Sequence, residues 1–177
     1  NLGALGDSGV VLTQDEALAA RVRSLRNHGR AGKHAVGEVG LNSRFDEIQA
    51  ATLRIKLRHL RDWTAQRQTI AARYREGLAG IPGLVVPPDG PGHVYHLFVV
   101  EVDAAIRDDV MAGLKERGIG VGLHYPVAVH QMAPYPSERP LPVSESLASR
   151  VVSLPMFAGM TVDEADRVCN SVRLVLT

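Results

Sequence analysis

Between Ser43 and Gly77 the chain contains neither Gly nor Pro, and this stretch constrains the fold more than any other feature. It predicts one long helix or a kinked pair of helices. Ser43 and Asp46 have the spacing of a capping box, so we expect the helix to begin there. Its apolar side chains form two neighbouring rows, namely Ile48, Ala51 and Ile55, and Leu53, Leu57 and Leu60. Such a wide apolar surface predicts contacts with a second domain and a second subunit, or simply a well-buried helix.

The segment before this stretch predicts a strand followed by a helix, and therefore an α/β layer. Residues 10–12 are a short apolar run after Gly9, which is typical of a buried strand. Thr13 and Glu16 have the spacing of a capping box, and a single apolar stripe then follows at helical spacing. Four glycines between residues 29 and 40, without any periodicity, predict a surface loop, and loops of this length often serve a site.

Dense Pro and Gly residues near residue 80 mark the entry to a compact C-terminal unit. Residues 94–102 are rich in β-formers, residues 106–118 have helical spacing that ends in Gly, and residues 119–123 alternate like a strand. This order predicts a β-α-β succession. A short helix over residues 142–151 and a last helix capped by Thr161 and Glu164 should follow.

The composition argues against several classes of protein. Twenty basic and nineteen acidic residues give a net charge of +1, and the four arginines within residues 21–30 have the spacing of a solvated helix face, so no nucleic-acid surface is expected. No apolar run approaches the roughly 18 residues that a membrane span needs. The single Cys169 excludes an intramolecular disulfide and suits a reducing cytoplasm. The histidines lack the spacing of metal ligands, so no metal site is expected.

Three polar rings gather after the predicted strand at residues 119–123. His124 and Tyr125 follow that strand directly, and His130 lies further along the same loop. Because α/β proteins bind ligands at the ends of strands, this segment is a candidate binding site, although a packed turn would give the same pattern.

Four segments together resemble the DegT/StrS-type family of pyridoxal-phosphate (PLP) sugar aminotransferases: residues 1–7, 41–51, 93–100 and 118–126. The first resembles the segment directly after the Schiff-base lysine of that family, which would put the lysine immediately before Asn1. The chain therefore opens inside a motif, and we expect it to be a piece of a longer protein. Ser8 departs from the family pattern, in which glycine is usual.

The resemblance implies an α/β fold, the C-terminal part of a type I PLP-dependent transferase similar to aspartate aminotransferase. In that fold a large domain around a mostly parallel sheet precedes a small domain, and two copies form a homodimer with shared active sites. Residues 1–42 would then be the end of the PLP-binding large domain and an active-site loop. Residues 43–80 would be a long connecting helix, and residues 81–177 the small C-terminal α/β domain.

The resemblance also implies roles for particular residues. In the family the Asn of an Asn-Ser-Arg segment reaches the PLP phosphate of the other subunit, and Asn42 matches it. A side-chain amide suits this contact because it donates to phosphate, and a helix N-terminus nearby adds partial positive charge. Arg44 is a candidate partner for a phosphate or for the carboxylate of the amino donor, or else a surface residue at the start of a helix.

Other candidates match the family's substrate region. His124, Tyr125 and His130 match the part that lines the sugar-nucleotide pocket in relatives. His28 and Arg30 lie in a stretch that resembles the one preceding an active-site loop.

The resemblance implies a cytoplasmic aminotransferase that moves an amino group from a donor such as glutamate to a keto sugar, usually linked to a nucleotide. The expected lysine lies outside this chain, so we expect the chain alone to be inactive. Two alternatives remain open. One is a PLP-dependent sugar dehydratase of the same family, in which histidine replaces the lysine, and the other is a non-catalytic fragment that dimerises or binds a sugar nucleotide.

Overall fold

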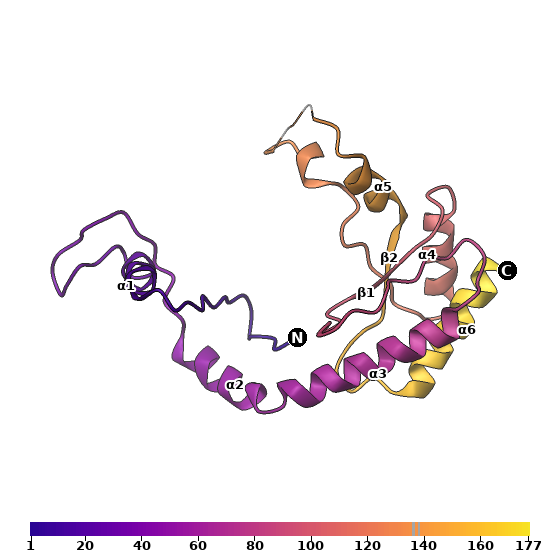
Figure 1. Cartoon of the computed structure of the whole chain (residues 1–177), viewed down its shortest axis with the longest axis horizontal. Coiled ribbons are helices and arrows are strands. Elements are labelled where there is room, and N and C mark those ends of the chain that lie inside the picture. The colour runs from indigo at the N-terminus through magenta and orange to yellow at the C-terminus, as the bar shows by residue number, and fades with distance from the viewer. Residues whose placement is uncertain (136, 138) are drawn as a thin grey trace. The chain divides into compact units, whose positions relative to one another are not determined.

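The computed structural model describes residues 1–135, 137 and 139–177, which form two compact units (Figure 1). The N-terminal unit comprises Leu2–Leu60, and the C-terminal unit comprises Asn1 together with Arg61–Thr177. Helix α2 (Glu47–Leu57) belongs to the first, and nearly all of helix α3 (Leu60–Leu78) belongs to the second. The breaker-free stretch is therefore a pair of helices, one of the two forms that the sequence predicted.

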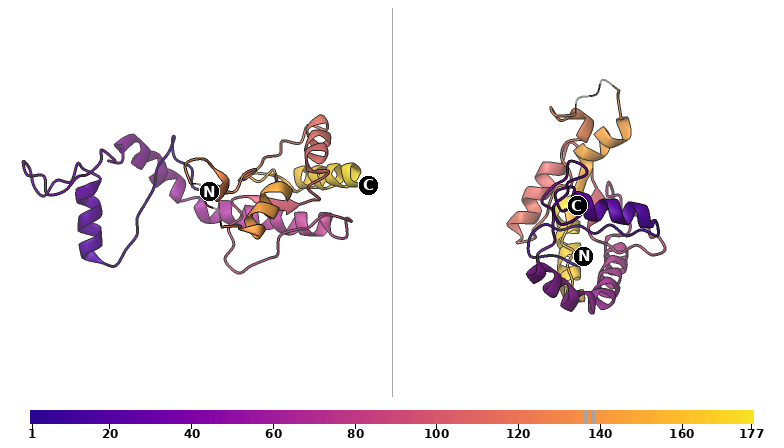
Figure 2. Two further views of the ribbon diagram at one scale, coloured as in Figure 1. Left: turned by 90° about the horizontal axis from the view of Figure 1, so that it is seen from above. Right: turned by 90° about the vertical axis from the view of Figure 1, so that its left-hand side faces the viewer.

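The C-terminal unit is a layer of helices on a short antiparallel sheet. Strand β1 (Phe98–Glu101) pairs with β2 (Val151–Leu154), so that Phe98 lies opposite Leu154. The helices of this unit after α3 are α4 (Arg107–Glu116), α5 (Pro142–Arg150) and α6 (Val162–Leu176), with a 3-10 turn η1 at Val129–Gln131. Helices α3 and α6 run side by side (Figures 1 and 2), and the Arg73–Asp166 ion pair joins them.

The core of this unit lies between the sheet and the helices. Its largest fully buried side chains come from α3, β1, α4, β2 and α6, and they include Ile70, Tyr74, Leu78, Phe98, Leu114, Val152 and Val172. The rings of Tyr74 and Phe98 have their centroids 4.9 Å apart in a tilted arrangement, and the Tyr74 hydroxyl donates to the Pro155 carbonyl at 2.7 Å. The aromatic pair therefore stays buried without leaving its polar atom unpaired.

One prediction about this sheet was wrong, and one strand was missed. Residues 119–123 do not form a strand, and only Gly122 makes an isolated bridge, with Ser153. The second strand is instead Val151–Leu154, which directly follows the helix that was correctly expected from Pro142. All four of its side chains are buried, so the alternation by which strands are usually recognised is absent.

The predicted helix caps were correct only for α6. Thr161 and Glu164 form a full capping box there, with hydrogen bonds in both directions. The boxes expected at Thr13 and Ser43 do not form, because helix α1 (Glu16–Leu25) and α2 begin later. Asp15 caps α1 and accepts from the backbone N–H groups of the second and third residues of the helix. A negatively charged carboxylate at this position also interacts favourably with the positive N-terminal end of the helix dipole.

The N-terminal unit has almost no interior of its own. Within residues 2–60, Gly29 is the only buried residue. The strand expected at residues 10–12 does not form: the segment has no strand pairing with the described residues, and its side chains are exposed. An apolar strand is stable only when it packs against other elements of structure. The exposed side chains of residues 10–12 have no such element against them among the described residues.

Gly77 permits the close approach of α3 and α6. A Cβ atom there would lie 2.6 Å from Sγ and 3.0 Å from Cβ of Cys169. We expect Gly77→Ala to lower the free energy of unfolding by about 1–3 kcal/mol, as overpacking does, although alanine favours a helix by about 1 kcal/mol. Urea unfolding of the protein measures this difference. In a Cys169→Ala background the cost should shrink, and an unchanged or higher stability of Gly77→Ala alone would contradict the packing described here.

The buried thiol of Cys169 should lower the free energy of unfolding at alkaline pH. Burial is the main cause that raises the pKa of its thiol from 9.0 to about 11. The unfolded thiol ionises first as the pH rises, so stability that is present below pH 9 is lost between pH 9 and 11, by about 2–3 kcal/mol. We expect Cys169→Ala to reduce this decline, measured by urea unfolding at pH 8, 9, 10 and 11. Parallel pH curves for the two proteins would exclude this role of the thiol.

Candidate functional site

Asn42 lies in a cavity of about 690 Å³ within the N-terminal unit. The residues that line the cavity lie within residues 7–13, within residues 19–26 of α1 and its C-terminal end, and within residues 42–49 at the start of α2. Its polar lining includes three arginines and two carboxylates: Arg23, Arg26, Arg44, Asp7 and Asp46. The balance of charge is therefore positive around Asn42, which suits an anionic group.

Backbone hydrogen bonds fix Asn42 against the end of α1. The Leu41 N–H donates to the Leu25 carbonyl at 2.8 Å, and the Ser43 N–H donates to the Arg26 carbonyl at 2.8 Å. These two bonds flank Asn42, which forms an isolated bridge with Asn27. The loop over residues 29–40 thus closes on itself and holds Asn42 beside Arg26.

Only glycine fits where this loop closes. Gly29 has φ +68°, and a Cβ atom on it would lie 1.7 Å from the Glu38 carbonyl oxygen. A Cβ atom on Gly40 would lie 2.1 Å from the Gly29 nitrogen. The predicted loop is therefore present, and two of its four glycines allow the backbone contact that holds the segment before Asn42.

Arg44 orients the side chain of Asn42. Its Nε donates to Asn42 Oδ1 at 3.1 Å. Because Oδ1 is the acceptor end of the amide, this contact leaves the Nδ2 donors of Asn42 without a partner among the described residues. An amide donor in a cavity lined by three arginines suits a phosphate, so the residues present fit the phosphate of PLP.

The structure separates the remaining candidates of the N-terminal unit from this cavity. His28 and Arg30 flank Gly29 and are not part of the cavity lining. Arg30 instead forms an isolated bridge with Val36 across the loop. Arg23 and Arg26, which the sequence placed on a solvated helix face, do line the cavity. Their spacing of three residues put both on one side of the helix, but a solvated helix face has the same spacing, so the sequence alone did not identify them.

His124, Tyr125 and His130 line a second cavity, of about 650 Å³, in the C-terminal unit. The sequence grouped these three rings, and the structure brings them together. His124 Nδ1 lies 2.9 Å from the Ser153 hydroxyl, and its ring meets Tyr125 edge-on with centroids 5.4 Å apart. The side chain of Tyr125 is exposed, so its hydroxyl is accessible to a ligand.

His130 is held more tightly than the other two rings. Its Nε2 lies 2.9 Å from Glu145 Oε1, and only 10% of its side chain is exposed. The Leu141 N–H, which donates to the same carboxylate, is the main cause that lowers the pKa of Glu145, and the His130 contact adds to it. Glu145 therefore joins the loop that carries His130 to the start of α5.

Asn1 belongs to the C-terminal unit although the residues that follow it do not. Its Nδ2 donates to the Val94 carbonyl at 2.7 Å, and its Oδ1 lies 3.0 Å from His96 Nδ1. Burial is the main cause that lowers the pKa of His96, and Arg67 and His124 act in the same direction. His96 is therefore neutral at pH 7, and since Oδ1 can only accept, its Nδ1 carries the hydrogen.

Two kinds of feature are absent from the described residues. None of the helices in residues 1–135, 137 and 139–177 has both the length and the hydropathy that crossing a bilayer requires. In the same residues no three His, Cys, Asp or Glu side chains lie close enough together to hold a metal ion.

The model of the DegT/DnrJ/EryC1/StrS aminotransferase family matches residues 1–173 of this chain. The chain belongs to this family. A dTDP-3-amino-3,4,6-trideoxy-alpha-D-glucose transaminase of Streptomyces venezuelae is 45% identical over 98% of the chain and 47% of its own length. The chain thus spans about half the length of the curated relative that it matches.

Solved structures of the family agree in fold. The S. venezuelae DesV structure in complex with a ketimine intermediate has a TM-score of 0.91 and 44% identity, over 97% of this chain and 47% of that one. A Bacillus subtilis NtdA structure with bound cofactor PMP has a TM-score of 0.86 and 28% identity, over 93% and 40%. The α/β fold predicted from the sequence, the C-terminal part of a PLP-dependent transferase, is therefore confirmed.

Proposed function

We propose that the protein containing this chain is a PLP-dependent aminotransferase that transfers an amino group from an amino acid such as glutamate to a nucleotide-linked keto sugar. The observation that carries the proposal is the positive cavity around Asn42, in a member of a family of sugar aminotransferases. PLP, when bound, serves as the electron sink for the transfer. The catalytic lysine is expected before Asn1, outside the chain.

In this proposal the N-terminal unit binds the cofactor's phosphate. Asn42 Nδ2 would donate to a phosphate oxygen of the PLP bound by the other subunit, while Arg44 holds Oδ1 and keeps the amide in the orientation that presents Nδ2. Arg23 and Arg26 add positive charge to the same cavity. A neutral amide within a cationic frame binds a phosphate dianion without burying an unpaired charge.

The cavity of the C-terminal unit would bind part of the sugar nucleotide. Tyr125 and His124 present ring donors and acceptors that suit sugar hydroxyls or a diphosphate. His130 has its Nε2 engaged by Glu145, so its role is to shape the wall of this cavity. His28 and Arg30 lie in the closed loop beside Asn42, where they would meet a substrate only when another surface covers that loop.

The second subunit of a homodimer would provide such a surface. Large apolar side chains of the N-terminal unit are exposed, among them Val10, Val11, Leu12, Val39, Leu41 and Ile48. Exposed apolar groups in this number indicate contact with other protein surface. The preceding half of the protein and a second copy are the surfaces that the family's architecture offers. We also infer a cytoplasmic enzyme, since the buried Cys169 is a free thiol.

A transamination assay tests the proposed function. The full-length protein, purified with PLP, is mixed with glutamate and nucleotide-linked keto sugars, and the amino sugar is detected by mass spectrometry. We expect product from the full-length protein and none from the 177-residue chain. Turnover by the chain alone, or the absence of visible PLP absorbance in the full-length protein, would refute the proposal.

The contact between Arg44 and Asn42 yields a prediction about cofactor affinity. A charge-assisted hydrogen bond contributes about 1.5–3 kcal/mol, so Asn42→Ala should raise the Kd for PLP roughly tenfold or more. Asn42→Asp should raise it further, because a carboxylate repels the phosphate. Arg44→Lys keeps the charge but loses the Nε donor, and it should also weaken PLP binding. Fluorescence titration of the full-length protein without cofactor measures each Kd.

The same series separates the two roles of Arg44. If Arg44 binds only the carboxylate of the amino donor, then Arg44→Lys will raise the KM for glutamate and leave the Kd for PLP unchanged. That outcome would contradict the orienting role. Glu116→Ala, at the exposed end of α4, provides a control that should change neither constant.

A further inference from the structure

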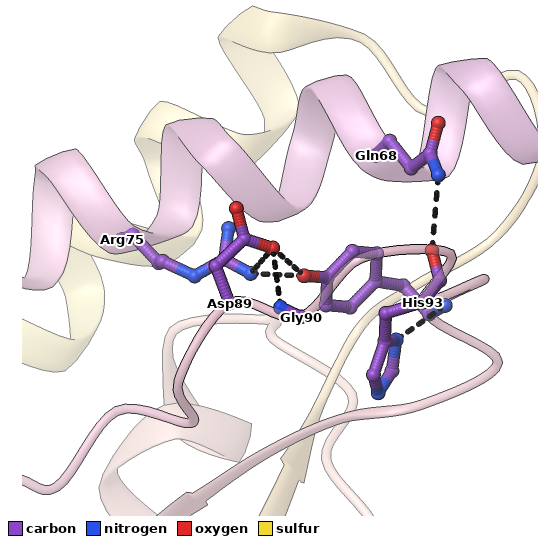
Figure 3. A network of polar contacts seen from close by, with 6 residues as sticks. Gln68, Arg75, Asp89, Gly90 and His93 are labelled. Carbon is purple, nitrogen blue, oxygen red and sulfur yellow. Dashed lines mark hydrogen bonds and ion pairs between the residues drawn. The ribbon is translucent and has the colours of Figure 1, made fainter.

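Three side chains of α3 fasten the loop over residues 89–97 to that helix. Figure 3 shows two of these attachments. Arg75 donates to Asp89 at 2.9 Å and also contacts the Tyr95 hydroxyl, which donates to the same carboxylate. Gln68 Nε2 donates to the His93 carbonyl at 3.0 Å (Figure 3). The loop is therefore held at its beginning and in its middle.

The third attachment is buried and holds the loop's end. Arg67 is only 8% exposed, and its Nη1 lies within hydrogen-bond distance of three carbonyl oxygens. These belong to Tyr95 at 3.0 Å, His96 at 3.1 Å and Met156 at 3.1 Å. The backbone of His96 is thus fixed by a side chain that cannot move without leaving its three acceptors unpaired.

Asn1 docks on this fixed backbone through both ends of its amide. One end donates to the Val94 carbonyl and the other accepts from His96 Nδ1. The partners lie more than ninety residues apart in the sequence. Neither aspartate nor alanine can replace both contacts, because aspartate has no hydrogen to donate and alanine has no polar atom.

We infer that His96 and the Val94 carbonyl form a dock for Asn1 that positions the residue preceding it, and that His96 is a positioning residue for cofactor chemistry. The inference rests on the proposed function, in which the preceding residue is the lysine that binds PLP. When the side chain of Asn1 is held at two points, the backbone of the residue before it has less conformational freedom. The lysine then loses less conformational entropy when it binds its cofactor. The C-terminal unit would thereby determine the direction in which that lysine leaves the backbone.

The test uses the full-length protein with three variants, Asn1→Ala, His96→Ala and the double variant. Each single variant should raise the Kd for PLP by about 3- to 10-fold, the effect of losing one or two neutral hydrogen bonds. The double variant should be no worse than Asn1→Ala, because both changes remove the same contact. The visible absorbance maximum of bound PLP and its pH titration should shift in all three.

A conservative variant and a control separate positioning from general damage. His96→Asn places an amide donor near the site of Nδ1 and should restore most of the affinity, whereas Glu116→Ala should change nothing. Unaltered affinity and absorbance in both single variants, with normal absorbance in the unsubstituted protein, would overturn the inference. So would strict additivity of the two single effects.

Failure of the proposed function has a different signature. If the unsubstituted protein shows no visible PLP absorbance, the proposed function falls and the role of the dock toward a lysine falls with it. A double-mutant cycle on urea unfolding of the cofactor-free protein then still measures the contact. Coupling between Asn1 and His96 would show that the dock is structural only, and its absence would remove the dock as well.

Discussion

The buried guanidinium of Arg67 is the interaction on which the rest of the C-terminal unit depends. It joins α3 to the loop before β1 and to the segment after β2 through three backbone carbonyls. Its Nε is buried without a hydrogen-bond partner among the described residues, and burial lowers its pKa. An unpaired buried donor is unfavourable by about 1–3 kcal/mol. The contacts of Nη1 offset this cost, because they pair a buried carbonyl of Tyr95 and the part-buried carbonyls of His96 and Met156.

The sequence predicted those elements whose signals are local. Helices α4 and α6 were found because their apolar spacing and, for α6, its cap lie within the segment itself. The loop before Asn42 was found from its glycines. β2 was missed because a fully buried strand of four residues has no alternation. Residues 10–12 were assigned as a strand on apolar character alone, and none of the residues that the structure describes pairs with them as a sheet neighbour.

Site residues, too, could be predicted only where the signal lies within one segment of the sequence. Asn42 came from the family resemblance, and Arg44 lies two residues away in the same segment, so both could be named. Arg23 and Arg26 could not, because an arginine on a helix is usually solvated and only the fold brings this face against the segment that carries Asn42. Arg67 was missed for a related reason. Nothing in the sequence distinguishes it from the other arginines of α3, since its acceptors are backbone carbonyls from distant parts of the chain.

The two units differ in how much buried core stabilises each of them. The C-terminal unit has a continuous core from α3 to α6, so its attachments to Asn1 are supported by packed structure. The N-terminal unit holds Asn42 through backbone bonds and glycine contacts but buries no large side chain. Its apolar groups must be covered before that geometry is stable, because backbone hydrogen bonds exposed to water contribute little to stability. The phosphate site proposed at Asn42 would become rigid only when surfaces cover this unit, so in that proposal cofactor binding and assembly of the protein should depend on each other.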